Sequence, residues 1–269
     1  MKRSPKPAAP PSDAELVKSF RELRLTGMAD AWESLHQAAS QQAWDGGRLL
    51  AALFEAEAAR RDANRRGRLL KESRLPLHKS LSQMNQDLLP TAVRRQLPGL
   101  LRGDFLDRRQ NLCVFGLPGR GKTHFLCALA QELVVNGRRI LFSSTGKLIE
   151  KLLAAKARHQ LDKELAKLDR FEAIILDDIG YVQHSREEME VLFTLIAERY
   201  ERGSLMISSN LAFSKWEQIF RDPMTAMAAV DRLVQHAVIL HFDGDSLRVK
   251  LAQKTQNQET QEADMTPQT

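Results

Sequence analysis

One run of eight residues constrains the fold of this chain more than any other part of its sequence. Residues Gly116–Thr123, which read GLPGRGKT, match the pattern G-x-x-x-x-G-K-[ST] at every fixed position. The run follows the apolar segment Asn111–Phe115, which predicts a strand, and precedes a helical pattern that begins near Lys122. A glycine-rich turn with an incidental lysine is the alternative, but a strand before and a helix after are the context that the motif requires. The sequence therefore predicts a binding site for a nucleoside triphosphate.

The residue types in this run suit the chemistry of phosphate binding. Glycines allow backbone conformations in which successive N–H groups point at phosphate oxygens, and the amino terminus of the next helix adds the positive end of its dipole. Lys122 would place a charge on the β and γ phosphates, and the Thr123 hydroxyl would coordinate Mg²⁺. The expected nucleotide-binding residues are Gly116, Pro118, Gly119, Arg120, Gly121, Lys122 and Thr123.

A second run places acidic groups after a buried strand. Residues 173–178 read AIILDD, so four apolar residues precede two aspartates. Asp177 would hold Mg²⁺ directly or through water, and Asp178 would orient or deprotonate the attacking water. The alternative is a strand that enters an ordinary loop, where aspartates are common. One further strand–helix pair separates this run from the glycine-rich one, as such sheets require, and this spacing favours the catalytic interpretation.

A third polar group closes the next expected strand, where the sequence reads Ser208-Ser209-Asn210. Asn210 could position the hydrolytic water beside the aspartates, or it could be an ordinary turn former. The residues alone leave both possibilities open.

The second half of the chain alternates short β-rich runs with amphipathic helical ones. This alternation predicts an α/β fold with a mostly parallel sheet covered by helices on both faces. The expected strands are 111–115, 139–143, 173–177, 205–208 and 237–242, and the expected helices are 122–135, 145–157 and 185–202.

The first part of the chain has a different pattern. Residues 1–11 are charged and rich in proline and lack the apolar segment of a secretory signal, so a disordered leader is expected. Residues 12–72 predict a small helical domain that binds DNA or a partner. It begins with a capping box at Ser12–Glu15, Gly46-Gly47 breaks its second helix, and its third turns Leu49, Leu53 and Phe54 inward. The expected helices are 13–24, 27–42 and 48–71.

The remaining boundaries follow from composition. Residues 73–110 hold Pro76, Pro90 and Pro98 between short apolar pieces and predict an ordered connector. Residues 111–251 would form the nucleotide-binding domain. The polar residues 252–269 would form a disordered tail.

Charge is distributed unevenly between the two parts. Residues 1–110 carry a net charge of +7, whereas residues 111–269 carry −1. Such a concentration of positive charge favours a polyanion, since each neutralised phosphate releases counterions; the alternative is a solvated helix face. The expected DNA-binding residues are Arg60, Arg61, Arg65, Arg66, Arg68 and Lys71.

Other classes of protein are excluded by simple features. No apolar run is long enough to span a bilayer, so no membrane partner is expected. Cys113 and Cys127 lie in apolar segments and are too few for a disulfide framework, which favours a cytoplasmic location.

These motifs together closely resemble those of IstB-type proteins, the AAA+ helper ATPases encoded with the transposases of insertion sequences. Helicase loaders of the DnaC type are their nearest relatives. The resemblance covers about residues 111–251 and extends more loosely to the basic first part. It rests on Gly116–Thr123, on Leu-Asp-Asp-Ile-Gly at 176–180, on Arg-Tyr-Glu-Arg-Gly-Ser at 199–204, on Ile207–Asn210, on Val-Asp-Arg-Leu at 230–233 and on Ser-Leu-Arg at 246–248.

The resemblance implies a role for each matching residue. Lys122 and Thr123 correspond to the Walker A pair, and Asp177 and Asp178 to the Walker B acids. Asn210 would be the sensor 1 residue. The chain has Asp178 where many AAA+ ATPases have glutamate, and the shorter arm would slow water activation.

Two arginines also gain a role from the resemblance. Arg232 would be the arginine finger that reaches a neighbouring subunit's γ-phosphate, and Arg248 would be sensor 2. Taken alone, Arg232 could pair with Asp231 on a surface helix and Arg248 could be an exposed strand residue. Leu247 stands where the family usually has tyrosine, which puts the geometry around Arg248 in doubt.

The implied function is an ATPase that assembles on duplex DNA with ATP and Mg²⁺ and assists a transposase, through target selection and transposase stimulation. Too few apolar residues follow Phe242 to build a C-terminal helical lid, so nucleotide would be held between subunits of a homo-oligomer. The alternative is an ATP-dependent loader of a replicative helicase. Two further alternatives remain. A P-loop kinase would need an acceptor pocket and a lid insertion. A scaffold that binds ATP but barely hydrolyses it would agree with the aspartate at position 178.

Overall fold

The computed structural model describes residues 11–180, 185–220 and 222–243. Contacts divide the chain into two units, residues 1–68 and 69–269. The expected leader, apart from Pro11, and the expected tail lie outside the described residues, and so does the region in which a lid was expected to be absent. Among the described residues, no helix is both long enough and apolar enough to cross a membrane.

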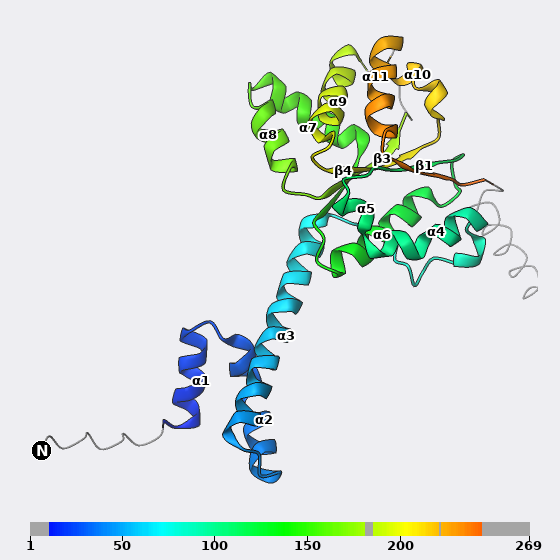
Figure 1. Ribbon diagram of the computed structural model, residues 1–269. Helices are drawn as coiled ribbons and strands as arrows, with labels where there is room; N and C mark the ends of the chain where they lie inside the picture. Colours follow the sequence, from blue (N-terminus) through cyan, green and yellow to red (C-terminus); the bar gives the residue numbers. More distant parts are fainter. Residues whose placement is uncertain (1–10, 181–184, 221, 244–269) are drawn as a thin grey trace, which may run out of the picture. The chain divides into compact units, whose positions relative to one another are not determined.

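The first unit is helical, as the sequence predicts (Figure 1). It contains α1 (Asp13–Glu22), α2 (Thr26–Gln41) and most of α3 (Gly46–Ser73), which continues into the second unit. The predicted capping box is present at the start of α1. The Glu15 N–H donates to Ser12 Oγ at 3.4 Å, and the Ser12 N–H donates to Glu15 Oε2 at 2.8 Å. Two orphan donors of the first turn are thereby satisfied.

Two details of this unit differ from the prediction. Gly46 and Gly47 form the first turn of α3, and the break after α2 falls before them, where Asp45 Oδ1 accepts the Arg48 N–H at 2.6 Å. A capping carboxylate therefore outweighs the poor helix propensity of two glycines. Phe54 is 59% exposed, although Leu53 is buried as expected.

Helices α2 and α3 pack closely at Gly27. A Cβ there would lie 2.6 Å from both the Ala56 carbonyl oxygen and Glu57 Cα. The buried Glu57 carboxylate accepts the N–H groups of Gly27 at 2.7 Å and Met28 at 3.3 Å, and the Arg61 guanidinium at 2.6 Å. Burial opposes ionisation of Glu57, but these hydrogen bonds outweigh it and hold its pKa below the ordinary value. The carboxylate thus caps the amino terminus of α2.

This close packing makes Gly27→Ala a test of the first unit. The added methyl group meets backbone atoms, which cannot move without separating the helices, so we expect a destabilisation of about 1–3 kcal/mol. Gly67→Ala is the matched control, because nothing lies within 4 Å of that Cβ, and alanine there should stabilise α3 by about 0.5–1 kcal/mol. Amide hydrogen exchange in α2 measures both. Equal protection in the two variants would contradict the packing described.

The second unit is built on a parallel sheet, which confirms the predicted fold class. Its strands are β1 (Leu112–Phe115), β2 (Ile140–Ser144), β3 (Ala173–Ile179), β4 (Ser204–Ser209) and β5 (Val238–His241). They lie in the order β2-β3-β4-β1-β5, and every pair described is parallel. The carboxyl ends of all five strands therefore share one edge of the sheet, called here the carboxyl edge, and their starts share the amino edge.

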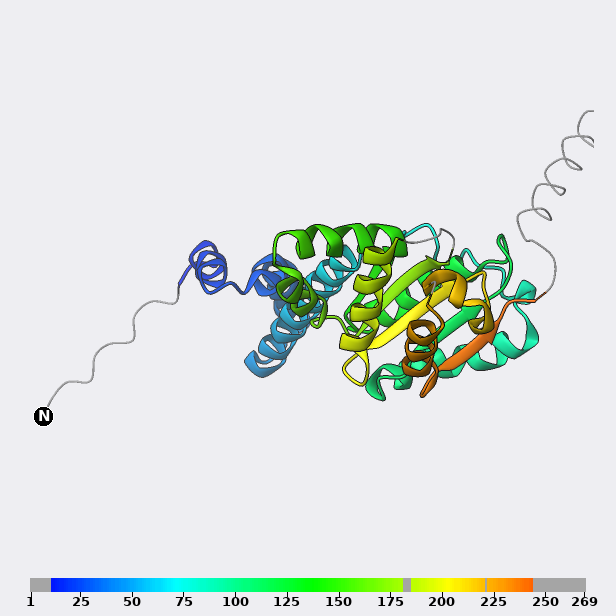
Figure 2. The same cartoon turned by 90° about the horizontal axis from the view of Figure 1, so that it is seen from above.

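Helices cover both faces of this sheet (Figures 1 and 2). One face carries α6 (Lys122–Val135), α4 (Thr91–Arg102) and α5 (Asp104–Asp107). The other carries α7 (Thr145–Ala157), α8 (Leu161–Leu168), α9 (Arg186–Arg199), α10 (Glu217–Phe220) and α11 (Pro223–Val234), and Figure 2 views the sheet from this side. Each layer has its own apolar core, so the central strands β1, β3 and β4 are largely buried between two layers, whereas Ile239 and His241 of the outer strand β5 are exposed.

Residues 73–110, expected as a connector, are instead part of the second unit. They contain α4, α5 and a short 3₁₀ turn at Gln86–Leu88. Val93, Leu97 and Phe105 are buried in the core beside α6. Pro98 lies inside α4, where it removes one helical hydrogen bond, and the burial of these apolar side chains offsets that loss. The prolines therefore do not prevent helices from forming in this segment, contrary to what the sequence pattern indicates.

Candidate nucleotide site

The glycine-rich run forms a loop that leaves the carboxyl end of β1. Gly116 has a φ of +153°, and a Cβ there would lie 2.5 Å from the Phe242 carbonyl oxygen. Gly121 has a φ of +86°, a conformation that residues with side chains rarely adopt. Arg120 Nη1 donates to the same Phe242 carbonyl at 3.1 Å. The loop is thus held against the end of the β5 region.

Lys122 begins α6 and turns its ammonium group into the loop. Its Nζ donates to the carbonyl oxygens of Gly116 at 2.7 Å and Leu117 at 3.1 Å, and the side chain is only 5% exposed. In the part of the chain that the structure describes, no side chain caps the start of α6. The orphan N–H groups of its first turn and the positive end of its dipole therefore face the loop. A phosphate in the loop would meet both, together with the ammonium group.

A network of hydroxyl groups fixes Asp177, which is buried at the end of β3. Thr123 Oγ1 donates to Asp177 Oδ1 at 2.8 Å, and Ser208 Oγ donates to the same oxygen at 2.6 Å. Thr145 Oγ1 donates to the Asp177 backbone carbonyl at 2.9 Å. Hydroxyl groups from α6 and β4 therefore hold one oxygen of this carboxylate, and a hydroxyl group from α7 holds the backbone of the same residue.

Two oxygen atoms in this network fit a magnesium ion. Mg²⁺ prefers oxygen ligands, keeps several waters, and is usually held by one or two protein groups together with substrate phosphates. Thr123 Oγ1 and Asp177 Oδ1 lie 2.8 Å apart beside the phosphate loop and offer such a pair. No group of three or more histidine, cysteine or acidic side chains among the described residues forms a metal cage, so phosphate and water would complete the coordination.

The other two predicted polar residues lie at the same edge. Asp178 is exposed and has a φ of +58°, where the register between β3 and β4 shifts, and its N–H donates to Ser208 Oγ at 2.8 Å. Asn210 is half-buried directly after β4, the strand that lies between β1 and β3. The carboxyl edge therefore gathers the loop, both aspartates and Asn210.

Arg232 lies elsewhere in the unit. Its backbone carbonyl, like that of Leu233, accepts a hydrogen bond from Asn111 Nδ2, just before β1 and hence at the amino edge. Its guanidinium lies 5.3 Å from the ring centroid of Phe193 on α9, on the face of the sheet opposite α6. The backbone of Arg232 thus lies at the edge opposite the loop, and β1 alone adds about 13 Å between the two edges. Its guanidinium lies on the face opposite α6. Arg248 lies outside the described residues.

Two residues of the site are not predicted by the sequence pattern. Ser208 only precedes the candidate Asn210, and Thr145 only begins an expected helix, yet both bond to Asp177. A serine within an otherwise apolar strand was the available signal for Ser208, since buried hydroxyl groups need partners. Nothing in the sequence around Thr145 indicates its contact, which depends on the pairing of β2 with β3.

Both cysteines have the buried positions expected of them. Cys113 and Cys127 are fully shielded from solvent. Burial raises the pKa of each thiol to about 12, so neither is a nucleophile near neutral pH.

Comparison with known proteins decides the family. The family described as IstB-like ATP binding protein matches residues 18–256. The chain belongs to this family. The resemblance drawn from the motifs is therefore confirmed, and the match extends through the helical first unit as far as residue 18.

Two similar proteins agree with this assignment. A protein of Sinorhizobium fredii, named as an insertion sequence ATP-binding protein, is 39% identical over 241 residues, which cover 89% of this chain and 81% of that protein. A protein named for insertion sequence IS21 of Pseudomonas aeruginosa is 37% identical over 185 residues, 69% of this chain and 70% of its own length.

Among solved structures, AMPPCP-bound DnaA from Aquifex aeolicus aligns with a TM-score of 0.53 at 15% identity, over 69% of this chain and 56% of that chain. A crystal structure of DnaI aligns with a TM-score of 0.50 at 20% identity, over 62% of this chain and 89% of that one. At such identities the likeness concerns the fold alone, which is of the AAA+ P-loop type.

Proposed function

We propose that this chain is a DNA-binding ATPase that assembles on duplex DNA with ATP and assists the transposase of its insertion sequence, in target selection and in stimulation of the transposase. One observation carries the proposal: in a member of the IstB-like family, the Lys122 loop, Thr123 and Asp177 form one connected site. The names of the relatives, which associate them with insertion sequences, support a role in transposition.

The residues at the carboxyl edge would divide the chemistry among them. The loop N–H groups and Lys122 bind the β and γ phosphates and offset the charge that develops on them. Thr123 and Asp177 would hold Mg²⁺, which supplies further charge neutralisation when bound. Asp178, exposed beside the buried Asp177, orients the attacking water and accepts its proton, and Asn210 positions that water from the neighbouring strand.

Arg232 would complete this site only in an assembly. Within one copy it lies at the opposite edge and on the opposite face of the sheet, so it would act on the triphosphate of a neighbouring copy. In the described chain no carboxylate forms an ion pair with it; its Nη1 instead donates to the Ala228 carbonyl at 2.8 Å. The arginine is therefore uncompensated by an acid and suited to a phosphate. Hydrolysis would depend on a homo-oligomer.

The basic residues of α3 would hold the duplex. Residues 58–68 are all exposed. Arg60 pairs with Asp30 at 3.3 Å and Arg61 with Glu57 at 2.6 Å, but no carboxylate among the described residues pairs with Arg65, Arg66, Arg68 or Lys71. Helical spacing places Arg65 and Arg68 on the same face as Arg61. Phosphate contacts of this kind bind without reading sequence.

The duplex-binding role predicts a specific dependence on salt. Replacing Arg65, Arg66 and Arg68 together with glutamine should weaken binding to a duplex of arbitrary sequence and reduce the slope of log affinity against log salt by about 2.7, since each phosphate contact contributes about 0.9. The matched control replaces Arg94, Arg95 and Arg102 of α4, which removes the same charge elsewhere. Fluorescence anisotropy across a salt series measures both. Identical slopes for the two triple variants would exclude α3 as the DNA-binding surface.

The proposed function is tested by ATP hydrolysis and partner capture. Phosphate release from ATP should require Mg²⁺ and increase when duplex DNA is added, and the chain should capture the transposase encoded beside it. Capture of a replicative helicase in place of the transposase would establish the alternative, a helicase loader. An absence of Mg²⁺-dependent ATP binding in a direct titration would refute both.

A further inference from the structure

The Arg-Tyr-Glu-Arg-Gly-Ser run at residues 199–204 has no role in the scheme above, although it contributes to the family resemblance. In the structure it forms the turn between α9 and β4 at the amino edge of the sheet. We propose that this turn, together with Asn111, fixes the last turn of α11, and that Tyr200 and Asn111 are thereby positioning residues for Arg232. This inference rests on the proposed role of Arg232 between neighbouring copies.

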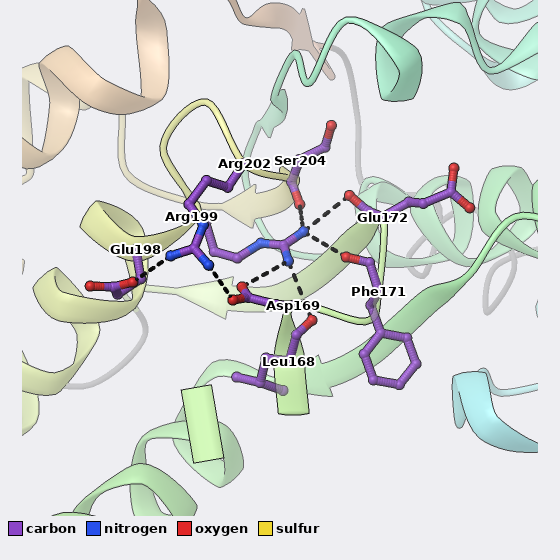
Figure 3. A network of polar contacts seen from close by, with 8 residues as sticks. All are labelled: Leu168, Asp169, Phe171, Glu172, Glu198, Arg199, Arg202 and Ser204. Atoms are coloured by element: carbon purple, nitrogen blue, oxygen red, sulfur yellow. Dashed lines mark hydrogen bonds and ion pairs between the residues drawn. The ribbon is translucent and has the colours of Figure 1, made fainter. Parts of the chain in front are cut away.

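The turn is anchored by a buried guanidinium group (Figure 3). Arg199 is 2% exposed, and its Nη2 donates to the carbonyl oxygens of Phe171 at 2.9 Å and Glu172 at 3.0 Å, while Nη1 donates to that of Leu168 at 3.3 Å. Desolvation lowers the pKa of Arg199 to about 10, so the group stays charged at neutral pH. Gly203 leaves room for it, because a Cβ there would lie 2.0 Å from Nη2.

Charged neighbours hold the outer side of the same turn. Arg202 pairs with Asp169 at 2.6 Å and with Glu198 at 2.8 Å, as Figure 3 shows. Arg109 Nη1 donates to the Glu201 carbonyl oxygen at 2.5 Å, and Glu201 has a φ of +57°. The path of the chain through the turn is therefore fixed relative to the starts of β3 and β4.

Two side chains connect this fixed base to α11. The Tyr200 hydroxyl donates to Gln235 Oε1, and Gln235 is the C-cap of α11. Asn111 Nδ2 donates to the Leu233 carbonyl at 3.0 Å, while Asn111 Oδ1 accepts the Leu205 N–H at 2.8 Å. The last carbonyl groups of a helix lack partners within it, so these contacts determine where α11 ends and, with it, the backbone that carries Arg232.

Loss of these contacts at the end of α11 should lower the rate of hydrolysis and leave the affinity for ATP unchanged. The loop lies at the opposite edge of the sheet, so a loose end of α11 leaves the nucleotide site of its own copy unchanged. Displacement of Arg232 by about 1 Å would reduce charge stabilisation on the neighbour's phosphate by tenfold or more. A purely structural role would instead reduce ATP affinity and thermal stability together with the rate.

Tyr200→Phe and Gln235→Leu test the inference, because each removes one partner of the hydrogen bond and leaves the buried Arg199 intact. We expect each variant to bind ATP as the unaltered chain does, with a DNA-stimulated kcat about tenfold lower and an unchanged KM. Gln235→Glu keeps the acceptor and should retain the rate. Gln218→Leu, an exposed glutamine of α10, is the matched control.

Mixing variants distinguishes positioning from other roles. Asp178→Asn should bind ATP without hydrolysing it and still offer a correctly placed Arg232, so adding it to Tyr200→Phe should restore hydrolysis. With random head-to-tail assembly, about one site in four joins an intact water-activating group to an intact arginine. Wild-type rates in both Tyr200→Phe and Gln235→Leu, or a low rate that mixing does not restore, would overturn the inference.

Arg232→Ala, assayed in parallel, separates this inference from the proposed function. If Arg232→Ala loses activity and regains it on mixing while Tyr200→Phe is fully active, only the positioning role fails. If Arg232→Ala hydrolyses ATP normally, or its loss is not restored by mixing, the role of Arg232 between copies fails as well.

Discussion

Lys122→Ala is expected to abolish ATP hydrolysis and to weaken ATP binding by about a hundredfold or more. The ammonium group already lies within the loop, bonded to the carbonyl oxygens of Gly116 and Leu117, so it meets the triphosphate without rearrangement of the backbone. Loss of one preorganised group that stabilises developing charge commonly costs 10²–10³ in rate. The nucleotide-dependent rings or filaments that the proposed function requires should disappear too, as seen by electron microscopy on duplex DNA.

The control for this prediction is another lysine of the same unit. Lys147 is exposed on α7, so Lys147→Ala removes the same charge outside the loop and should leave ATP affinity unchanged. Titration with a fluorescent ATP analogue in Mg²⁺ measures both variants. Comparable affinities of Lys122→Ala and the unaltered chain would show that the loop does not bind the triphosphate.

Arg232→Ala is expected to retain ATP binding and to lose hydrolysis by about a thousandfold, at the lower end of what a trans-acting arginine contributes. The physical reason is that its backbone lies at the amino edge and its guanidinium lies against Phe193 on the face opposite α6, away from the loop of its own copy. Removing it leaves the phosphate loop, Thr123 and Asp177 untouched. Transition-state charge on the neighbouring copy's phosphate then lacks a compensating cation.

The measurement pairs ATP affinity with single-turnover hydrolysis on duplex DNA. Arg95→Ala is the matched control, because Arg95 is an exposed arginine of α4 on the other face of the sheet. A variant that loses affinity and rate in proportion would place Arg232 in the site of its own copy and contradict the structure. In the unaltered chain, trans catalysis requires assembly, so the rate per copy should rise with protein concentration. A rate that is independent of protein concentration would contradict the role of Arg232 between copies.

The sequence predicts those parts of the fold and of the site that a pattern of residues within one short segment encodes. The glycine-rich motif predicts the loop at 116–123. Period and composition predict the apolar strand that carries the aspartates and the helix Thr145–Ala157, because buried strands and amphipathic helices each leave a pattern in the chain. Asp178 and Asn210 both lie at the carboxyl edge because Asp178 stands near the end of β3, Asn210 directly follows β4, and the two strands are parallel.

The remainder depended on contacts between distant segments. Pro76, Pro90 and Pro98 predict an ordered connector, but the core against α6 maintains α4 around Pro98. Phe54 follows the helical period yet remains exposed, since the packing of α2 against α3 centres on Gly27 and Glu57. Ser208 meets Asp177 only through the register of β3 with β4. The hydrogen bond between Tyr200 and Gln235 joins residues 35 positions apart, and no pattern in the sequence near either residue indicates it.

The separation of Arg232 and the Lys122 loop onto opposite edges of one sheet gives each copy a donor end and an acceptor end. If copies stack so that each donor serves the next acceptor, an open filament always leaves the acceptor at one terminus unserved, whereas a closed ring leaves none. Turnover per copy should then rise with filament length and level off, and short assemblies should be disproportionately slow. In this way, the rate of hydrolysis per copy would report the length of DNA that the filament covers.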